Sequence, residues 1–106
     1  MKFLTCLAIW WASFYDPKPK HVTLYGTGLL TAHRELPPAT RLLITNLTNN
    51  KSVVVIVCGY GPAKWTKRDL DLSRQAFKQI APLSVGVIKV KYQILGYLPN
   101  SDRNFA

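Results

Sequence analysis

The sequence predicts a small, mainly β protein with one short helix, and three features of the chain support this. Three runs have the composition of strands, RLLITNL (41–47), SVVVIVC (52–58) and GVIKVKYQIL (86–95), and residues typical of turns separate them. Only the segment that begins at Ser73 has the apolar spacing of a helix. Several short strands and one long loop, at 16–28, favour a small closed barrel.

The length of 106 residues is enough for one domain with one modest hydrophobic core. No repeat or linker marks a second unit, so we expect residues 1–106 to form a single domain whose core spans about 9–96. A hydrophobic content of 48% with 18% charged residues excludes the disordered class of chains.

The N-terminal segment has two interpretations. Lys2 precedes an apolar stretch at 3–12, which has the length of a signal-peptide core and is too short to span a membrane. No small-residue cleavage site follows it, and tryptophans stand where cleavage would occur. We therefore expect 7–15 to be the first strand, and the alternative is that residues 1–12 are a remnant leader.

The middle of the chain is expected to hold a long loop followed by a hairpin. Residues 16–28 contain two prolines and two glycines and predict the loop, and a short apolar segment at 29–33 follows. The two prolines of RELPPAT (34–40) block both helix and ladder pairing and predict a turn. The turn TNNK joins the runs at 41–47 and 52–58, because Asn tolerates a positive φ. The continuous β-branched run of the second strand predicts burial on both of its faces.

The helix is expected to run from about Ser73 to Ala81. Ser73 is a favourable N-cap, and Leu72 and Phe77 have the spacing of a hydrophobic staple across it. Pro82 ends the helix.

The last strand alternates between apolar and polar residues, which predicts burial of one face. We expect Ile88, Val90, Tyr92 and Ile94 to point inward and Lys89, Lys91 and Gln93 to point outward. The polar tail at 99–106 is expected to be frayed.

The charge of the chain is strongly positive. Fourteen Lys and Arg oppose five Asp and Glu, which gives a formal net charge of +9. This surplus favours a polyanionic partner, namely nucleic acid, acidic lipid or an acidic cell-wall polymer, and the alternative is a solvated basic surface. The basic residues are scattered, with small groups at Lys18/Lys20, Lys64/Lys67/Arg68 and Lys89/Lys91.

The cysteines and histidines predict no metal site and no cofactor. His21 and His33 are isolated in the sequence, and neither has a second ligand at metal-binding spacing. Cys6 and Cys58 are expected not to form a structural disulfide, since Cys6 precedes the first strand and Cys58 ends an interior one.

Five blocks of the sequence resemble, in the same order, the RlpA-like (rare lipoprotein A) double-psi β-barrel family. The family patterns are A-S-W-Y-G, T-A-A-H-x-x-L-P, V-x-V-x-x-N-D-R-G-P and R-x-x-D-L-S. The matching blocks are ASFY (12–15), LTAHRELPPATRLLITNLTNNKSVVVIV (30–57), GYGP (59–62), RDLDLSRQAF (68–77) and GVIKVKYQIL (86–95). The resemblance implies a six-stranded double-psi β-barrel with one short helix, a fold that expansins share more distantly.

The resemblance also implies a function on peptidoglycan. Members of this bacterial envelope family include lytic transglycosylases, which cut glycan strands that lack stem peptides. A carboxyl group protonates the glycosidic oxygen, and a base helps the 6-hydroxyl to close an anhydro ring. In the family, this acid–base chemistry is attributed to three residues: a Glu in the loop after the first strand, the His of T-A-A-H and the Asp of N-D-R-G-P.

Two of these three groups are absent from the matching positions. The His corresponds to His33, but the Asp corresponds to Gly59. The loop Glu is expected near Val22 or Thr23, and no acid lies between Asp16 and Glu35.

Other residues are candidates for the site. Asp71 matches the Asp of D-L-S, so His33 and Asp71 are the candidate catalytic pair, and the alternative role of Asp71 is a partner of the helix N-terminus. The substrate-binding candidates are Tyr60, Gly61, Pro62, Trp65 and Asp69. Tyr60 and Trp65 could stack on sugar rings, and their alternative role is packing of the barrel.

Three functions follow, in order of preference. The first is a peptidoglycan-binding, catalytically impaired RlpA-like domain. The second is an active lytic transglycosylase with an altered site, and the third is a basic barrel that binds nucleic acid. The first predicts a monomer in the bacterial cell envelope or outside the cell, with glycan strands as its partner and without a transmembrane span.

Overall fold

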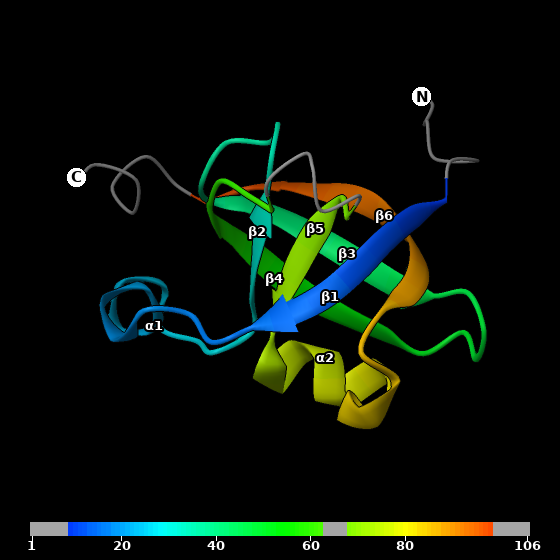
Figure 1. Ribbon diagram of the computed structural model, residues 1–106. Helices are drawn as coiled ribbons and strands as arrows, with labels where there is room; N and C mark the ends of the chain where they lie inside the picture. Colours follow the sequence, from blue (N-terminus) through cyan, green and yellow to red (C-terminus); the bar gives the residue numbers. More distant parts are fainter. Residues whose placement is uncertain (1–8, 63–67, 99–106) are drawn as a thin grey trace.

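The computed structural model describes residues 9–62 and 68–98, which form six strands, two α-helices and one 3₁₀ helix (Figure 1). Cys6, Trp65 and the tail at 99–106 lie outside the described residues. The elements are β1 (Trp10–Tyr15), α1 (Pro19–Tyr25), β2 (Leu30–His33), β3 (Thr40–Asn46), β4 (Ser52–Gly59), β5 (Leu70–Ser73), α2 (Arg74–Ile80), η2 (Leu83–Val85) and β6 (Ile88–Tyr97).

The six strands close into a barrel in the order β1-β5-β2-β4-β3-β6. Two pairs of neighbours are parallel, β1 with β5 and β2 with β4, and the other four pairs are antiparallel. The expected hairpin is present as the antiparallel pair β3 and β4. Because β5 lies between β1 and β2, a segment from the second half of the sequence separates the first two strands of the chain.

The hydrophobic core fills the barrel, and α2 covers one of its ends (Figure 1). The N-cap prediction is confirmed, since the Ser73 hydroxyl accepts a hydrogen bond from the backbone N–H of Ala76. Phe77 is fully buried on this helix and packs edge-on against Phe14, with ring centroids 5.0 Å apart. The other members of the core include Ala12, Leu42, Ile44, Val53, Val55, Val57, Leu70, Leu72, Ile80, Ile88 and Val90.

The expectation of a loop at 16–28, and of only one helix, is wrong because this segment contains α1. Pro19 stands in its first turn, where the missing N–H costs nothing. Gly26 ends it in the left-handed region, with φ of 70°, and donates its N–H to Val22 O. The prolines and glycines that suggested a loop therefore begin and end a short helix.

Two expectations about strand faces are also wrong. Val54 in β4 is 41% exposed, so this strand is not buried on both faces, because its outer face lies on the surface of the barrel. Ile94 in β6 is 44% exposed, although Ile88 and Val90 are buried as predicted. Ile94 pairs with the buried Leu42 at the last position before a register shift in the β3–β6 pairing, so its exposure marks where the regular pairing over the core ends.

Candidate functional site

Four residues form a continuous line across neighbouring strands on the outer face of the barrel, which we call the register strip. Ser13 in β1 pairs with Asp71 in β5, Asp71 pairs with Ala32 in β2, and Ala32 pairs with Gly59 in β4. Paired residues point to the same face, and the flanking Leu70 and Leu72 point into the core. The strip therefore brings together segments that are far apart in the sequence.

Asp71 is the carboxylate of the register strip. The Ser13 hydroxyl donates a hydrogen bond to Asp71 Oδ1, and the Thr31 hydroxyl donates to the main-chain oxygen of Asp71 at 2.9 Å. The side chain is half-buried. Ser73, not Asp71, caps the following helix, so the carboxylate is held by a neighbouring strand instead of by the helix end.

A tyrosine and the free thiol flank the strip. The Tyr15 hydroxyl lies 3.1 Å from Cys58 Sγ, so this side chain reaches from β1 across two strands to β4. Burial raises the pKa of Tyr15 far above its usual value, and the hydrogen bond to Cys58 adds to this. Burial also raises the pKa of the Cys58 thiol, although the hydrogen bond from Tyr15 opposes the shift. Both groups are therefore neutral at neutral pH.

The strip ends at Gly59. A Cβ added at Gly59 would have no atom of the described residues within 4 Å, and its backbone lies outside the left-handed region. Gly61 approaches the strip from the following turn, since a Cβ there would lie 3.9 Å from Ala32 Cβ. Tyr60 is 68% exposed, whereas Pro62 is buried. The turn thus leaves room for a ligand beside an exposed aromatic ring.

His33 lies inside the barrel with both ring nitrogens engaged. Its Nδ1 accepts the backbone N–H groups of Glu35 at 3.0 Å and Leu36 at 3.1 Å. The proton of the neutral ring is therefore on Nε2, which lies 3.1 Å from the Tyr92 hydroxyl. Burial lowers the pKa of His33, with a smaller opposing effect of Glu35.

Asp69 holds strands together with both of its carboxylate oxygens. Oδ2 accepts the backbone N–H of Trp11 at 2.7 Å, and Oδ1 pairs with Arg34 at 3.2 Å. The Asp69 N–H also donates to Trp11 O at 2.8 Å. The structure therefore brings Gly61 close to the strip and links Pro62 and Asp69 through Arg34, whereas His33 points into the barrel, away from the strip.

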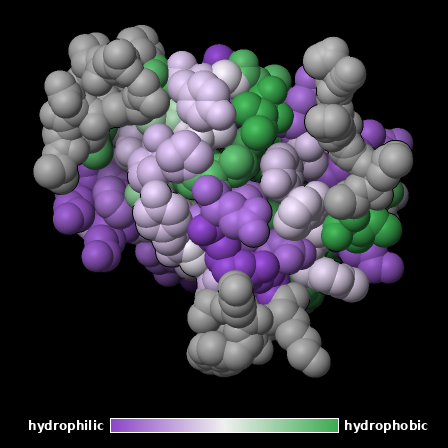
Figure 2. Space-filling view, turned by 90° about the horizontal axis from the view of Figure 1, so that it is seen from above, coloured by the Kyte–Doolittle hydropathy of each residue, from purple (hydrophilic) through white to green (hydrophobic). Residues whose placement is uncertain are grey.

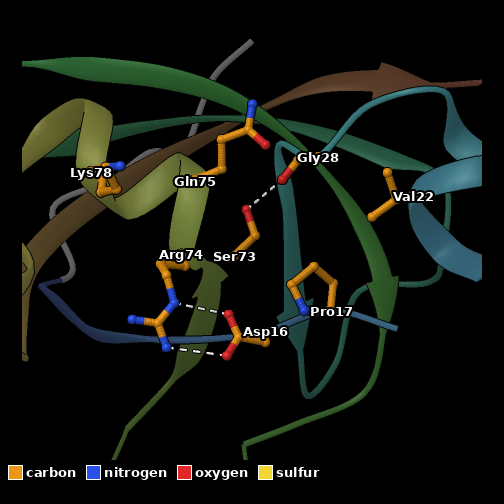
Figure 3. Close-up of a pocket in the computed structure, with 8 residues that line it drawn as sticks. All are labelled: Asp16, Pro17, Val22, Gly28, Ser73, Arg74, Gln75 and Lys78. Carbon is orange, nitrogen blue, oxygen red and sulfur yellow. Dashed lines mark hydrogen bonds and ion pairs between the residues drawn. The ribbon is translucent and has the colours of Figure 1, made fainter. Parts of the chain in front are cut away.

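A shallow pocket of about 480 Å³ lies beside α1 and the start of α2 (Figure 3). Its charged residues are the ion pair Arg74–Asp16, at 2.9 Å, and Lys78. Val22, near which the resemblance expects the loop Glu, also lines it. None of the strip residues lines this pocket.

The end of the barrel opposite α2 has a mixed surface. Figure 2 shows a band of hydrophobic side chains that extends from the upper edge of the view toward its centre, with weakly polar side chains on both sides and strongly hydrophilic ones at and below the centre. Within residues 9–62 and 68–98, no three His, Cys, Asp or Glu side chains are close enough to hold a metal ion. The helices of the same residues are all too short or too polar to cross a membrane.

Sequence reasoning missed Ser13 and Tyr15 as members of the site. Both belong to the ASFY block, so the resemblance contained a signal for them. Their contacts with Asp71 and Cys58, respectively, span 58 and 43 residues of sequence, which no local pattern predicts.

The chain matches the family model described as "Lytic transglycolase" over residues 10–92. It is 37% identical over 93 residues to the endolytic peptidoglycan transglycosylase RlpA of Rickettsia felis, covering 87% of this chain and 39% of that protein. It is 34% identical over 100 residues to the protein of the same name from Campylobacter jejuni, covering 92% of this chain and 36% of that protein. The chain thus spans little more than a third of the length of these two relatives.

The fold is similar to that of an expansin. A mutant expansin of Clavibacter michiganensis, solved in complex with cellohexaose, superposes with a TM-score of 0.59 at 17% identity. The match covers 83% of this chain and 50% of the expansin. The family model and the six-stranded closed barrel confirm the predicted double-psi fold. The chain belongs to the lytic transglycolase family of double-psi β-barrel domains.

Proposed function

We propose that this domain binds glycan strands of peptidoglycan along the register strip and does not cleave them at the rate typical of its family. The observation that carries the proposal is the strip itself, which ends at Gly59 with open space where the family has its catalytic Asp. The relatives named as peptidoglycan transglycosylases support the choice of substrate. The place of action is then the bacterial cell envelope or the outside of the cell.

The chemistry of lytic cleavage explains the expected impairment. A proton donor must protonate the departing glycosidic oxygen, and a base must accept a proton from the 6-hydroxyl. Gly59 has no side chain to do either, which leaves Asp71 as the carboxylate of the strip. Loss of a positioned general acid or base costs about 10²–10⁴ in rate.

His33 supports the same proposal. Protonation at Nδ1 would break its two hydrogen bonds with backbone N–H groups, and burial already lowers its pKa. We assign His33 the role of holding the turn after β2, instead of exchanging protons with a glycan. Asp71, half-buried beside Ser13, is the residue that would carry any remaining acid catalysis.

Binding needs an exposed aromatic ring and a shallow surface beside it. Tyr60 offers a ring on which the apolar face of a sugar can stack, and Gly61 and Pro62 shape the turn that presents it. Asp69 contributes by fixing Trp11 and Arg34, so its effect on binding is indirect. Trp65 follows this turn in the sequence and remains a candidate for stacking.

The Gly59→Asp variant tests the proposal, with Gly59→Asn as its matched control. The open space at Gly59 admits either side chain, and only the first restores a carboxyl group. Each protein is incubated with peptide-free peptidoglycan strands, and anhydro-muramic products are measured by mass spectrometry. We expect binding without products for the unmodified protein and for Gly59→Asn, and a gain of products for Gly59→Asp.

Abundant anhydro products from the unmodified protein would overturn the impairment and favour the active enzyme with an altered site. Asp71→Asn would then be expected to abolish the activity, because the Asp71 carboxylate would be the group that acts in place of the missing catalytic Asp. Absence of glycan binding in all three proteins would overturn the proposed substrate. The third function, nucleic-acid binding, would then be tested at two salt concentrations.

A further inference from the structure

Beside the register strip, Trp11 presents an exposed indole ring with a lysine over it. Trp11 is 42% exposed, and Lys89 Nζ lies 5.3 Å from its ring centroid. Trp11 lies just before the ASFY block, and Lys89 lies in the 86–95 block, from which no candidate site residue was drawn. The two residues are register partners in β1 and β6. We propose that Trp11 and Lys89 form a subsite for a sugar that bears a carboxylate, namely the lactyl-substituted amino sugar of peptide-free glycan strands, which deepens the function proposed above and rests on it.

The position of Trp11 makes it continuous with the strip. Trp11 and Ser13 are two residues apart on the same face of β1, so their Cα atoms are about 7 Å apart. Ser13 is the strip residue that donates to Asp71. One glycan strand that lies across Asp71 can therefore reach Trp11 with a neighbouring sugar.

The backbone of Trp11 is fixed before any ligand binds. Its N–H donates to Asp69 Oδ2 at 2.7 Å, and its carbonyl accepts the Asp69 N–H at 2.8 Å. Asp69 is itself held by Arg34. Because the Trp11 backbone is already fixed, its indole ring loses little conformational entropy when a sugar stacks on it, which favours binding.

The charge of Lys89 is available to a ligand. In the described part of the chain the ion pairs are Arg34–Asp69 and Arg74–Asp16, so no described carboxylate neutralises Lys89. Its side chain is exposed. An ammonium group above an indole ring offers a stacked sugar a cationic partner for a carboxylate at the ring's edge.

The glycan chemistry supplies the matching anion. In a strand without stem peptides, every second sugar bears a lactyl ether that ends in a free carboxylate. A strand with stem peptides has an amide there, and a chitooligosaccharide has a hydroxyl. The Trp11–Lys89 subsite would therefore favour the peptide-free strand over an uncharged chain of the same length.

The test compares two probes, peptide-free peptidoglycan strands and a chitooligosaccharide of matched length, by titration calorimetry at low and high salt. We expect the unmodified protein to prefer the carboxylated strands, and the preference to shrink at high salt. Lys89→Gln should weaken binding of the carboxylated strands about two- to fivefold and leave the chitooligosaccharide unchanged, as for a surface ion pair. Trp11→Ala should weaken both probes, by on the order of tenfold.

Lys91→Gln is the matched control, because Lys91 lies on the same face of β6 but pairs with Thr45, away from β5. It should leave both affinities unchanged. Unaltered affinities in Lys89→Gln or Trp11→Ala, or equal loss in Lys91→Gln, would overturn the subsite while the proposed function stood. If the unmodified protein binds neither probe, the proposed function fails, and the subsite fails with it.

Discussion

At the scale of single residues, the structure separates the two groups that the sequence pairs as catalytic candidates. Asp71 lies on the outer face of the barrel with its carboxylate next to Ser13. His33 lies inside, where its Nδ1 accepts two backbone N–H groups. A histidine in this arrangement stabilises a turn only while it is neutral, so its contribution to folding depends on pH.

The first prediction concerns this pH dependence. Burial lowers the pKa of His33 in the folded protein from its ordinary value of 6.5, so below that pH the unfolded chain binds more protons. The contribution of His33 to stability is therefore complete above pH 6.5 and is lost as the pH falls below it. The slope is at most about 1.4 kcal/mol per pH unit for this one group.

His33→Asn keeps an acceptor near the Nδ1 position and cannot titrate. We expect it to flatten the decline of the free energy of unfolding below pH 6.5, measured by urea unfolding at several pH values. His21→Asn is the comparison, since the pKa of His21 is also lowered by burial but its ring is more exposed. An unchanged pH dependence in His33→Asn would contradict the prediction.

At the scale of elements, Ser73 joins α2 to the barrel. Its hydroxyl accepts the N–H groups of Ala76 and Leu30, both at 3.2 Å, and donates to Gly28 O at 2.7 Å. One side chain thus caps the helix and ties it to the beginning of β2. The cap is readable from the sequence, but the bonds to Leu30 and Gly28 are not.

The second prediction is that Ser73→Ala destabilises more than the loss of an ordinary cap. A lost cap costs about 0.5–2 kcal/mol, and a buried N–H left unpaired at Leu30 adds about 1–3 kcal/mol. We expect a loss of about 2–4 kcal/mol in the free energy of unfolding, measured from denaturant midpoints. Ser84→Ala, at an exposed position in η2, should change it by no more than about 0.5 kcal/mol. Equal effects of the two variants would argue against the link between α2 and β2.

At the scale of the whole molecule, barrel closure and the helix that covers one end form a single core. The strands β1 and β5 are neighbours although some 55 residues of sequence separate them, and β2 and β4 are parallel neighbours as well. Both parallel pairs belong to one closed barrel, so the core forms only when segments that are distant in the sequence pair with one another. Phe77 of α2 lies at the end of that core against Phe14.

The third prediction is that Phe77→Ala lowers the stability of the entire domain. Removal of a fully buried Phe side chain costs about 3–5 kcal/mol, a large fraction of the 5–15 kcal/mol typical of a domain. The thermal unfolding transition should shift to lower temperature as one cooperative step. Gln79→Ala, exposed on the same helix, is the control and should leave the transition nearly unchanged. If α2 unfolded separately in Phe77→Ala while the barrel kept its original unfolding temperature, the prediction of a single cooperative core would be wrong.

The sequence by itself determined the mainly β class, the hairpin of β3 and β4, the helix α2 with its cap, and the family. These features are local, because alternation, turn residues and capping act over a few residues, and the family blocks occur in a fixed order. The match to the family blocks also predicts that Gly59 takes the position of the family's Asp. The same local rules were wrong about α1, because Pro19 and Gly26 begin and end a helix in a segment that they predicted to be a loop.

Only the tertiary structure decided what surrounds Gly59. The register of two strand pairs places Asp71 one strand away from Ala32 and two away from Gly59. It also brings Tyr15 to Cys58 and Lys89 to Trp11, contacts that span 43 and 78 residues of sequence. The physical reason is barrel closure, since the neighbours of each strand are set by pairings between distant segments and no local pattern encodes them.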